Sequence, residues 1–252
     1  MMTSPHQLIM RGVQLTKRWG GLLAVNAVDI DLCLGQIHAV IGTNGAGKST
    51  LMNLLSGEIP LSSGQIELLG QNITKISQPA RAKMGLGKSY QRNTIFPELS
   101  VLENCRLAAQ SRLEKPWHFW ESGQQCQFSY DYALQTLEKT GLHQVLKRQA
   151  GLLSHGQKRQ LEVAMCLATN PKVLLLDEPL AGMGADETER MLNFLMDLRS
   201  NHAMMLVEHD MDAVFKVADV ITVMVNGSVI AKGTPEQVRN DQQVQTAYLG
   251  AE

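Results

Sequence analysis

A short glycine-rich segment in the first quarter of the chain has the residue types of a phosphate-binding loop. It fits the pattern Gly-x-x-x-x-Gly-Lys-Ser/Thr. The segment and the residue after it read Gly42, Thr43, Asn44, Gly45, Ala46, Gly47, Lys48, Ser49 and Thr50. Glycines let backbone N–H groups turn toward phosphate oxygens, and a helix N-terminus adds partial positive charge. We therefore expect Lys48 to bridge the β- and γ-phosphates of a nucleotide, and the Ser49 hydroxyl to hold Mg²⁺.

Two adjacent carboxylates follow an apolar run in the second half of the chain. Asp177 and Glu178 come directly after Val173–Leu176. Unpaired charge is costly in a protein interior, so carboxylates at the end of a buried strand need a reason to be there. Beside a phosphate-binding loop, we expect Asp177 to lie next to Mg²⁺ and Glu178 to polarise an attacking water. The alternative is a solvated loop at the strand end. Together the two motifs predict an ATPase or GTPase.

Alternating strand and helix patterns predict the elements that position these motifs. Gln36–Ile41 is an apolar run that leads into the glycine loop, and Leu51–Ser56 after it consists of good helix formers. Val173–Leu176 and Ala203–Val207 are wholly apolar, which is typical of strands buried on both faces. This alternation predicts an α/β domain.

Further local patterns add an edge strand, two helices and a hairpin. Leu161, Ala164, Met165 and Ala168 have helical spacing, and Asn170-Pro171 ends that helix. The expected edge strand is Gln65–Leu68, and a further helix is Asp186–Arg199. The hairpin joins Ile221–Val225 to Ser228–Ala231 through Asn226-Gly227.

The middle of the chain, residues 92–153, is predicted to be a helical insertion. Ser100 and Glu103 have the spacing of a helix capping box, and a second helix is expected to end near Thr140, before Gly141. The stretch 111–127 has no clean period and carries the aromatic residues Trp117, Phe119 and Trp120. These aromatic side chains either contact a membrane partner or form a small core of the insertion.

Composition excludes several classes of protein. The chain has 252 residues, of which 44% are apolar and 19% charged, so it is not disordered. A net charge of −1 gives no general attraction to nucleic acid. We expect no signal peptide, because residues 1–12 lack a long apolar stretch, and no membrane span, because no apolar run is long enough. We expect the four cysteines, which are Cys33, Cys105, Cys126 and Cys166, to be reduced core residues.

A third motif lies between the glycine loop and the two carboxylates. Leu153-Ser154-His155-Gly156-Gln157 resembles the signature motif of ATP-binding cassette (ABC) ATPases. Other elements of that family match in order along nearly the whole chain. Trp19 corresponds to the aromatic residue that stacks on adenine, Gln91 to the glutamine of the Q-loop, and His209 to the switch histidine. The resemblance implies a P-loop ABC-type fold with an inserted helical subdomain and an antiparallel β-subdomain.

The resemblance also implies roles for individual residues, with ATP and Mg²⁺ as ligands. The catalytic residues would be Lys48, Gln91, Glu178 and His209. The Mg²⁺ ligands would be Ser49, Gln91 and Asp177. Ser154, Gly156 and Gln157 would act on the nucleotide of a second subunit, so that a complete site needs two cassettes. The chain departs from the family at His155, where a glycine is usual, and at Gly184, where an aspartate is common.

The resemblance further implies one ABC ATPase domain over residues 1–252. Its core would comprise 1–91 and 154–240, with the insertion at 92–153 and a C-terminal tail at 241–252. Four segments are similar to the ATP-binding subunits of bacterial importers for branched-chain amino acids. These segments are Arg18–Val25, Glu208–Met211, Gly233–Glu236 and Ala247–Gly250.

Such a subunit would lie peripherally on the cytoplasmic face of the inner membrane. Its partners would be two membrane-spanning permease subunits, a second ATPase subunit or a second copy of itself, and indirectly a periplasmic solute-binding protein, with no nucleic acid. Three alternatives stay open: a urea importer of the same branch, which shares Leu153–Gln157 and Ala181–Met183; the ATPase of lipopolysaccharide export; and a soluble ABC ATPase without a transport role.

Overall fold

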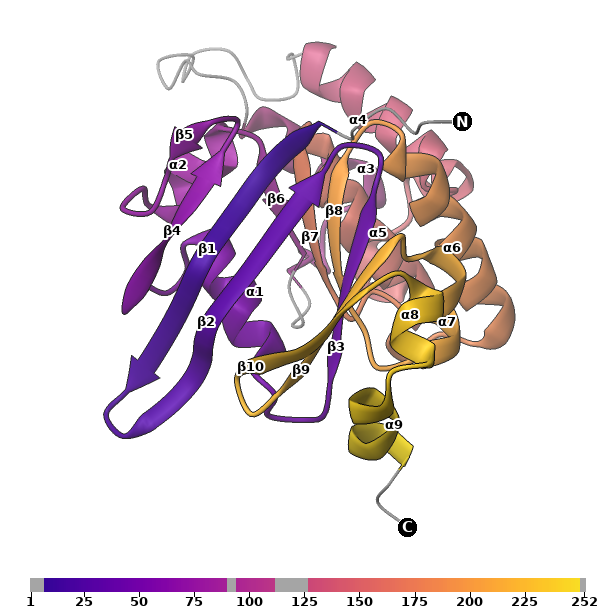
Figure 1. The fold of residues 1–252 in the computed structure, drawn as a ribbon. Coiled ribbons are helices and arrows are strands. Elements are labelled where there is room, and N and C mark those ends of the chain that lie inside the picture. Colours follow the sequence, from indigo (N-terminus) through magenta and orange to yellow (C-terminus); the bar gives the residue numbers. More distant parts are fainter. Residues whose placement is uncertain (1–6, 90–93, 112–126, 250–252) are drawn as a thin grey trace.

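The computed structural model describes residues 7–89, 94–111 and 127–249, so Gln91, Cys126 and the aromatic segment Trp117–Trp120 lie outside the described residues. Within them, a six-stranded sheet has the strand order β10-β9-β3-β8-β7-β6 (Figure 1). Its strands are β3 (Ile37–Gly42), β6 (Leu86–Lys88), β7 (Val173–Asp177), β8 (Ala203–Val207), β9 (Val220–Val225) and β10 (Ser228–Gly233). All neighbours in this sheet are parallel except β9 and β10.

The central strands are buried on both faces, as their apolar runs predict. Every residue of β7 and β8 is buried. Along β7, Val173 and Leu175 face one hydrophobic cluster, whereas Leu174 and Leu176 face another. This alternation follows from the period of two in a strand. The carboxyl ends of β7 and β8 therefore lie side by side in a rigid, doubly covered sheet.

A second, antiparallel sheet of four strands has the order β2-β1-β4-β5. Its strands are β1 (Leu8–Trp19), β2 (Leu22–Cys33), β4 (Ser63–Leu68) and β5 (Gln71–Asn72). The prediction that Gln65–Leu68 is an edge strand is wrong, because the two-residue β5 continues the same hairpin and pairs with the outer side of β4. Helix α1 (Lys48–Ser56) shares one hydrophobic cluster with strands of both sheets.

Helix α2 (Gln78–Lys83) lies beside α1 and β6, whereas the helices that follow it form the insertion and cover the sheet face opposite α1. The bounds of these later helices are α3 (Val101–Gln110), α4 (Gln127–Lys139), α5 (His155–Ala168), α6 (Ala185–Arg199), α7 (Met211–Val217), α8 (Pro235–Arg239) and α9 (Gln242–Leu249). Short 3-10 helices span His143–Val145 and Ala150–Leu152. Helices α3, α4 and α5 share a separate hydrophobic cluster, and α6 and α7 pack on the sheet near α5 (Figure 1). These layers confirm the predicted α/β fold with a helical insertion and an antiparallel sheet.

Several predicted element ends are confirmed. The Ser100 hydroxyl accepts a hydrogen bond from the Glu103 backbone N–H at 3.1 Å and caps α3. Helix α4 ends just before Gly141, whose φ of 74° is left-handed. Asn226 and Gly227 both have positive φ, which suits the tight turn between β9 and β10.

The described cysteines are reduced, as expected: Cys33, Cys105 and Cys166 are free thiols. In the described part of the chain, no helix has the length and apolar character needed to cross a membrane.

Candidate functional site

The glycine loop connects β3 to α1 at the edge where the parallel strands end. Gly47 is the N-cap of α1 and has a φ of 101°. A Cβ at this position would lie 2.4 Å from the carbonyl oxygen of Ala24 in β2, so that only glycine fits. The loop leads directly into the N-terminus of α1, where the first backbone N–H groups of a helix have no intrahelical partner. This is the local geometry of an anion site at a helix N-terminus.

The Lys48 side chain is folded into this loop. Its Nζ donates hydrogen bonds to the carbonyl oxygens of Gly42 at 2.6 Å and Thr43 at 3.1 Å, and only 6% of the residue is exposed. Burial lowers the pKa of Lys48, while the nearby carboxylates of Glu178 and Asp177 raise it. Carbonyl dipoles thus hold the ammonium group in the loop, ready for a more strongly negative partner such as a phosphate.

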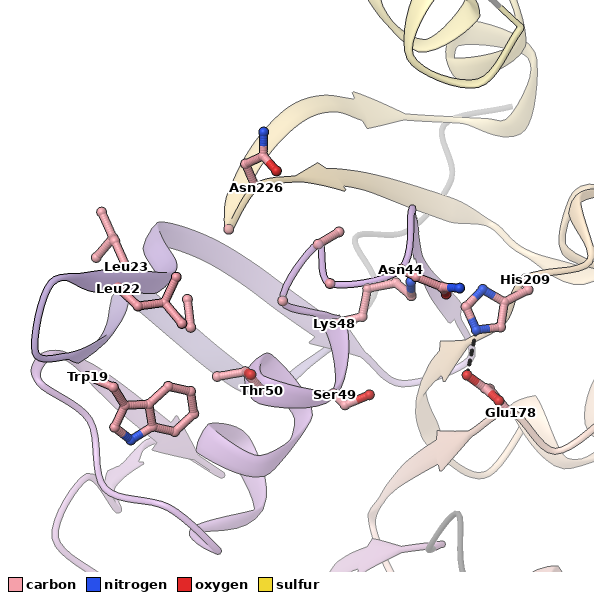
Figure 2. Close-up of a pocket in the computed structure, with 15 residues that line it drawn as sticks. Trp19, Leu22, Leu23, Asn44, Lys48, Ser49, Thr50, Glu178, His209 and Asn226 are labelled. Atoms are coloured by element: carbon pink, nitrogen blue, oxygen red, sulfur yellow. Dashed lines mark hydrogen bonds and ion pairs between the residues drawn. The ribbon is translucent and has the colours of Figure 1, made fainter. Parts of the chain in front are cut away.

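A cavity of about 620 Å³ extends from this loop (Figure 2). Trp19 lies at one end of it, and Glu178 and His209 lie at the other, with Lys48 between them. The cavity is lined by Trp19, Leu22, Leu23, Ala24, Asn44, Gly45, Ala46, Gly47, Lys48, Ser49, Thr50, Glu178, His209, Asn226 and Gly227. Trp19 is 48% exposed at the end of β1 and lines the cavity, and the Lys17 ammonium lies over its ring, 5.3 Å from the ring centre. The cavity combines an aromatic surface with a phosphate loop.

Asp177 ends β7 and is almost wholly buried. Its backbone N–H donates to the Ser89 hydroxyl at 3.1 Å, but its carboxylate Oδ1 has no hydrogen-bond partner among the described residues. Burial raises the pKa of Asp177, as does the neighbouring Glu178, whereas Lys88, Lys48 and Arg159 lower it. A buried carboxylate oxygen without a donor suits a cation, and Mg²⁺ prefers such oxygen ligands. The residues present therefore fit Mg²⁺.

Glu178 has an unusual backbone conformation that aims its side chain at His209. Its φ of 49° is left-handed, and its backbone N–H donates to the carbonyl oxygen of Val207 in β8 at 2.9 Å. The carboxylate Oε1 lies 2.5 Å from Nε2 of His209 (Figure 2). A left-handed non-glycine residue of this kind is strained and persists only where its surroundings hold it.

The third motif is placed away from this cavity. Ser154 is the N-cap of α5, and its hydroxyl accepts from the Gln157 backbone N–H at 3.2 Å. In return, the Gln157 side chain accepts from the Ser154 backbone N–H at 3.1 Å, which completes a capping box. Neither these residues nor Gly156 lines the cavity. Within one chain, the structure does not bring Ser154, Gly156 and Gln157 to the glycine loop.

The Glu187 side chain covers the exposed start of α5. A Cβ at Gly156 would lie 2.5 Å from the Glu187 carboxylate carbon, and the Ser154 hydroxyl is 3.5 Å from Glu187 Oε1. The departure at His155 has a local role, because its ring lies against Gly182, where a Cβ would approach it to 2.7 Å. The loop after Glu178 thus packs onto the start of α5.

Two features of the site were missed by sequence reasoning. The sequence predicts Asn226-Gly227 only as a hairpin turn, yet this turn lines the cavity, and the Gly227 backbone N–H donates to the Ala46 carbonyl oxygen at 3.0 Å. The sequence marks Glu208 only as part of a family segment, yet Glu208 is a buried carboxylate beside the site. The turn residues carried no signal of this contact. The position of Glu208, a charged residue directly after an apolar strand, is a sequence signal that could have indicated a role at the site.

Comparison with known proteins decides the family. A family model described as ABC transporter matches residues 25–181. The chain belongs to the ABC transporter family. A second model, described as branched-chain amino acid ATP-binding cassette transporter, matches residues 228–252. The family predicted from the motifs is thereby confirmed, and with it the activity of an ATPase that binds nucleotide as a transporter subunit.

Two curated relatives match this ABC subunit over nearly its full length. One is the high-affinity branched-chain amino acid transport ATP-binding protein BraF of Pseudomonas aeruginosa, and the other is the corresponding protein LivG of Escherichia coli. Each is 38% identical over 94% of this chain and 95% of its own. A solved nucleotide-free cassette from an ABC transporter superposes with a TM-score of 0.86 at 29% identity, covering 96% of this chain and 99% of that one.

Proposed function

We propose that this chain is the ATP-hydrolysing subunit of a membrane importer for branched-chain amino acids. The observation that carries the solute class is the 38% identity, over 94% of the chain, to two ATP-binding proteins of branched-chain amino acid transport. The match of residues 228–252 to a model of the same transporters supports it from a segment outside the general ATPase motifs.

The cavity suggests how the residues divide the work of hydrolysis. Adenine stacks on Trp19, and the phosphates enter the glycine loop, where Lys48 exchanges its two carbonyl partners for phosphate oxygens. Glu178 polarises the attacking water, and His209 contacts the γ-phosphate. Phosphoryl transfer needs mainly positioning and charge stabilisation, which is what fixed groups on the ends of a rigid sheet supply.

Mg²⁺ would be held by Ser49 and Asp177 of the described residues, together with Gln91. When bound, the ion neutralises charge that develops on the phosphate oxygens. The buried Asp177 Oδ1, which has no hydrogen-bond partner among the described residues, supports this assignment. The position of Ser49 also supports the assignment, since Ser49 lines the cavity directly after Lys48.

A complete site requires a second cassette. Ser154, Gly156 and Gln157 would complete the nucleotide site of a partner ATPase, which is either a different subunit or a second copy of this chain. The distance of these residues from their own cavity supports action in trans, because a helix N-terminus with a capping serine is well suited to meet a phosphate. ATP would then hold the two cassettes together until hydrolysis.

The proposed importer would place the subunit peripherally on the cytoplasmic face of the cell membrane. Two membrane-spanning permeases would receive the motion of the cassettes, and a periplasmic solute-binding protein would deliver the solute without touching this chain.

A urea importer is the second candidate function. It is favoured by the segments Leu153–Gln157 and Ala181–Met183, which this chain shares with the ATPases of urea importers.

Co-purification tests this proposal. The tagged chain is extracted from membranes in mild detergent, and its partners are identified by mass spectrometry. We expect two polytopic proteins and an ATPase. The purified complex is then placed in proteoliposomes with its binding protein, and uptake of labelled leucine and urea is compared with that of a Glu178→Gln complex. ATP-dependent leucine uptake that the variant lacks supports the proposal. Uptake of urea instead, or recovery of the chain without membrane proteins, contradicts it.

A further inference from the structure

A buried carboxylate that none of the motifs includes lies next to the catalytic edge of the sheet. Glu208 follows β8 directly and is only 4% exposed. Its two oxygens accept hydrogen bonds from two different backbone N–H groups. Oε1 accepts from Leu180 at 2.8 Å, and Oε2 accepts from His209 at 3.2 Å. One side chain therefore connects two loops that follow neighbouring strands.

These two loops carry the proposed catalytic pair. Leu180 lies two residues after Glu178, and the other donor is the backbone of His209 itself. The hydrogen bond from the Glu178 backbone N–H to the Val207 carbonyl oxygen ties the start of the first loop to the end of β8. Hydrogen bonds from the backbone N–H groups of Glu178 and Leu180 thus hold the left-handed Glu178 against β8 and the residue that follows it. Such ties are what a strained residue requires to stay in place.

Burying the Glu208 carboxylate costs desolvation free energy, and capping of the helix that follows does not account for this cost. Burial raises the pKa of Glu208 to about 7; the backbone bonds from Leu180 and His209 oppose that rise, and the Glu178 charge adds to it. Capping of α7 does not require Glu208, because Asp210 supplies that bond by accepting from the Ala213 backbone N–H at 3.1 Å. The two loop contacts are therefore what the buried carboxylate contributes.

We propose that Glu208 is a positioning residue for ATP hydrolysis, which holds Glu178 and His209 in register by bridging their two loops. The proposal rests on the roles proposed above for Glu178 and His209. Glu208 itself is buried and does not line the cavity. Its loss should misplace the general base and the histidine while leaving the glycine loop and Trp19 as they are. Small misplacements of catalytic groups cost large factors in rate.

Two substitutions of graded severity test this inference in the purified transporter complex, in which both cassettes are present. Glu208→Ala removes both acceptors, whereas Glu208→Gln keeps one carbonyl oxygen for the Leu180 N–H. We expect Glu208→Ala to lower kcat roughly 10- to 100-fold, with Glu208→Gln in between. The dissociation constant of ATP should change less than about two-fold, because its main contacts lie elsewhere. Asp210→Asn, which keeps the cap of α7, is the matched control and should hydrolyse at the normal rate.

A combined variant separates positioning from a general loss of structure. In a Glu178→Gln background, Glu208→Ala should cause little further loss of hydrolysis, since residues that act through one another are not additive. Unchanged kcat in Glu208→Ala would overturn the inference, and so would a fall in kcat matched by equal weakening of ATP binding. A wild-type complex without ATPase activity would instead count against the proposed function, so the two failures are distinguishable.

Discussion

The imidazole of His209 lies directly against the carboxylate of Glu178, with 2.5 Å between Nε2 and Oε1. The two residues are 31 positions apart and follow β7 and β8, which pair in parallel with Asp177 opposite Val207. At this separation no water fits between them. Entry of an attacking water and a γ-phosphate must therefore part the pair, and each residue then has a separate task.

Replacing Glu178 by Gln should abolish most hydrolysis and leave ATP binding intact. The amide is a poor base for water, while Lys48 and Trp19 are unchanged. Removing general-base catalysis typically costs about 10²–10⁴-fold in rate. Phosphate release and binding of a fluorescent ATP analogue measure the two quantities separately. Glu236→Gln, an exposed carboxylate on α8, is the control and should behave as wild type. Near-normal turnover in Glu178→Gln would contradict the role given to Glu178.

Replacing Trp19 by Ala should weaken binding of ATP but not of inorganic triphosphate. Stacking of a base on an aromatic ring is worth about 1–3 kcal/mol, which corresponds to a loss of roughly 5- to 150-fold in affinity. Triphosphate uses only the glycine loop and should bind the variant as it binds wild type. Calorimetric titration with both ligands measures the difference, and Trp19→Phe should recover much of it. Equal weakening for both ligands would mean that Trp19 does not contact adenine.

Replacing Gly156 by Ala should impair dimer formation more than folding. The added methyl group meets the Glu187 carboxylate, which is the end of a flexible side chain and can move away. Thermal stability should consequently change little. In a Glu178→Gln background, which retains ATP, we expect less ATP-induced dimer by sedimentation velocity, because the methyl projects from the start of α5. ATP binding by the monomer is the internal control. Undiminished dimer would argue against action of Gly156 in trans.

His38 should make the fold sensitive to acid. This residue of β3 is buried, its Nε2 is 2.8 Å from the Thr222 hydroxyl, and burial lowers its pKa from 6.5 to about 4. The unfolded chain therefore binds a proton that the folded protein excludes, so stability is lost as pH falls from about 6.5 toward 4. Between pH 7 and pH 5, this one group should remove about 2 kcal/mol from the free energy of unfolding.

Urea unfolding of wild type and His38→Gln at the two pH values measures the contribution of His38. The stability advantage of wild type over the variant should shrink by that amount at pH 5. An advantage that is equal at both pH values would show that His38 does not bind its proton differently in the two states.

The consecutive motifs were predictable from the sequence because their chemistry depends on neighbours along the chain. The glycine loop Gly42–Ser49 requires its residues in one order, and the pair Asp177-Glu178 is recognisable after a wholly apolar strand. The Asn226-Gly227 turn and the buried strands β7 and β8 are likewise local patterns. These features were enough to predict the α/β fold class, and the resemblance of Leu153–Gln157 to the ABC signature motif indicated the family.

Only the tertiary structure decided which distant groups meet. The pairing of Glu178 with His209, the bridge from Glu208 to the two loops, and the contact of Gly227 with the phosphate loop all join segments far apart in sequence. Such contacts depend on strand order and register, which are determined by burial of whole faces of a sheet and not by any local pattern. For the same reason, the local pattern of β4 predicts an edge strand, whereas its pairing with β5 places it inside the sheet.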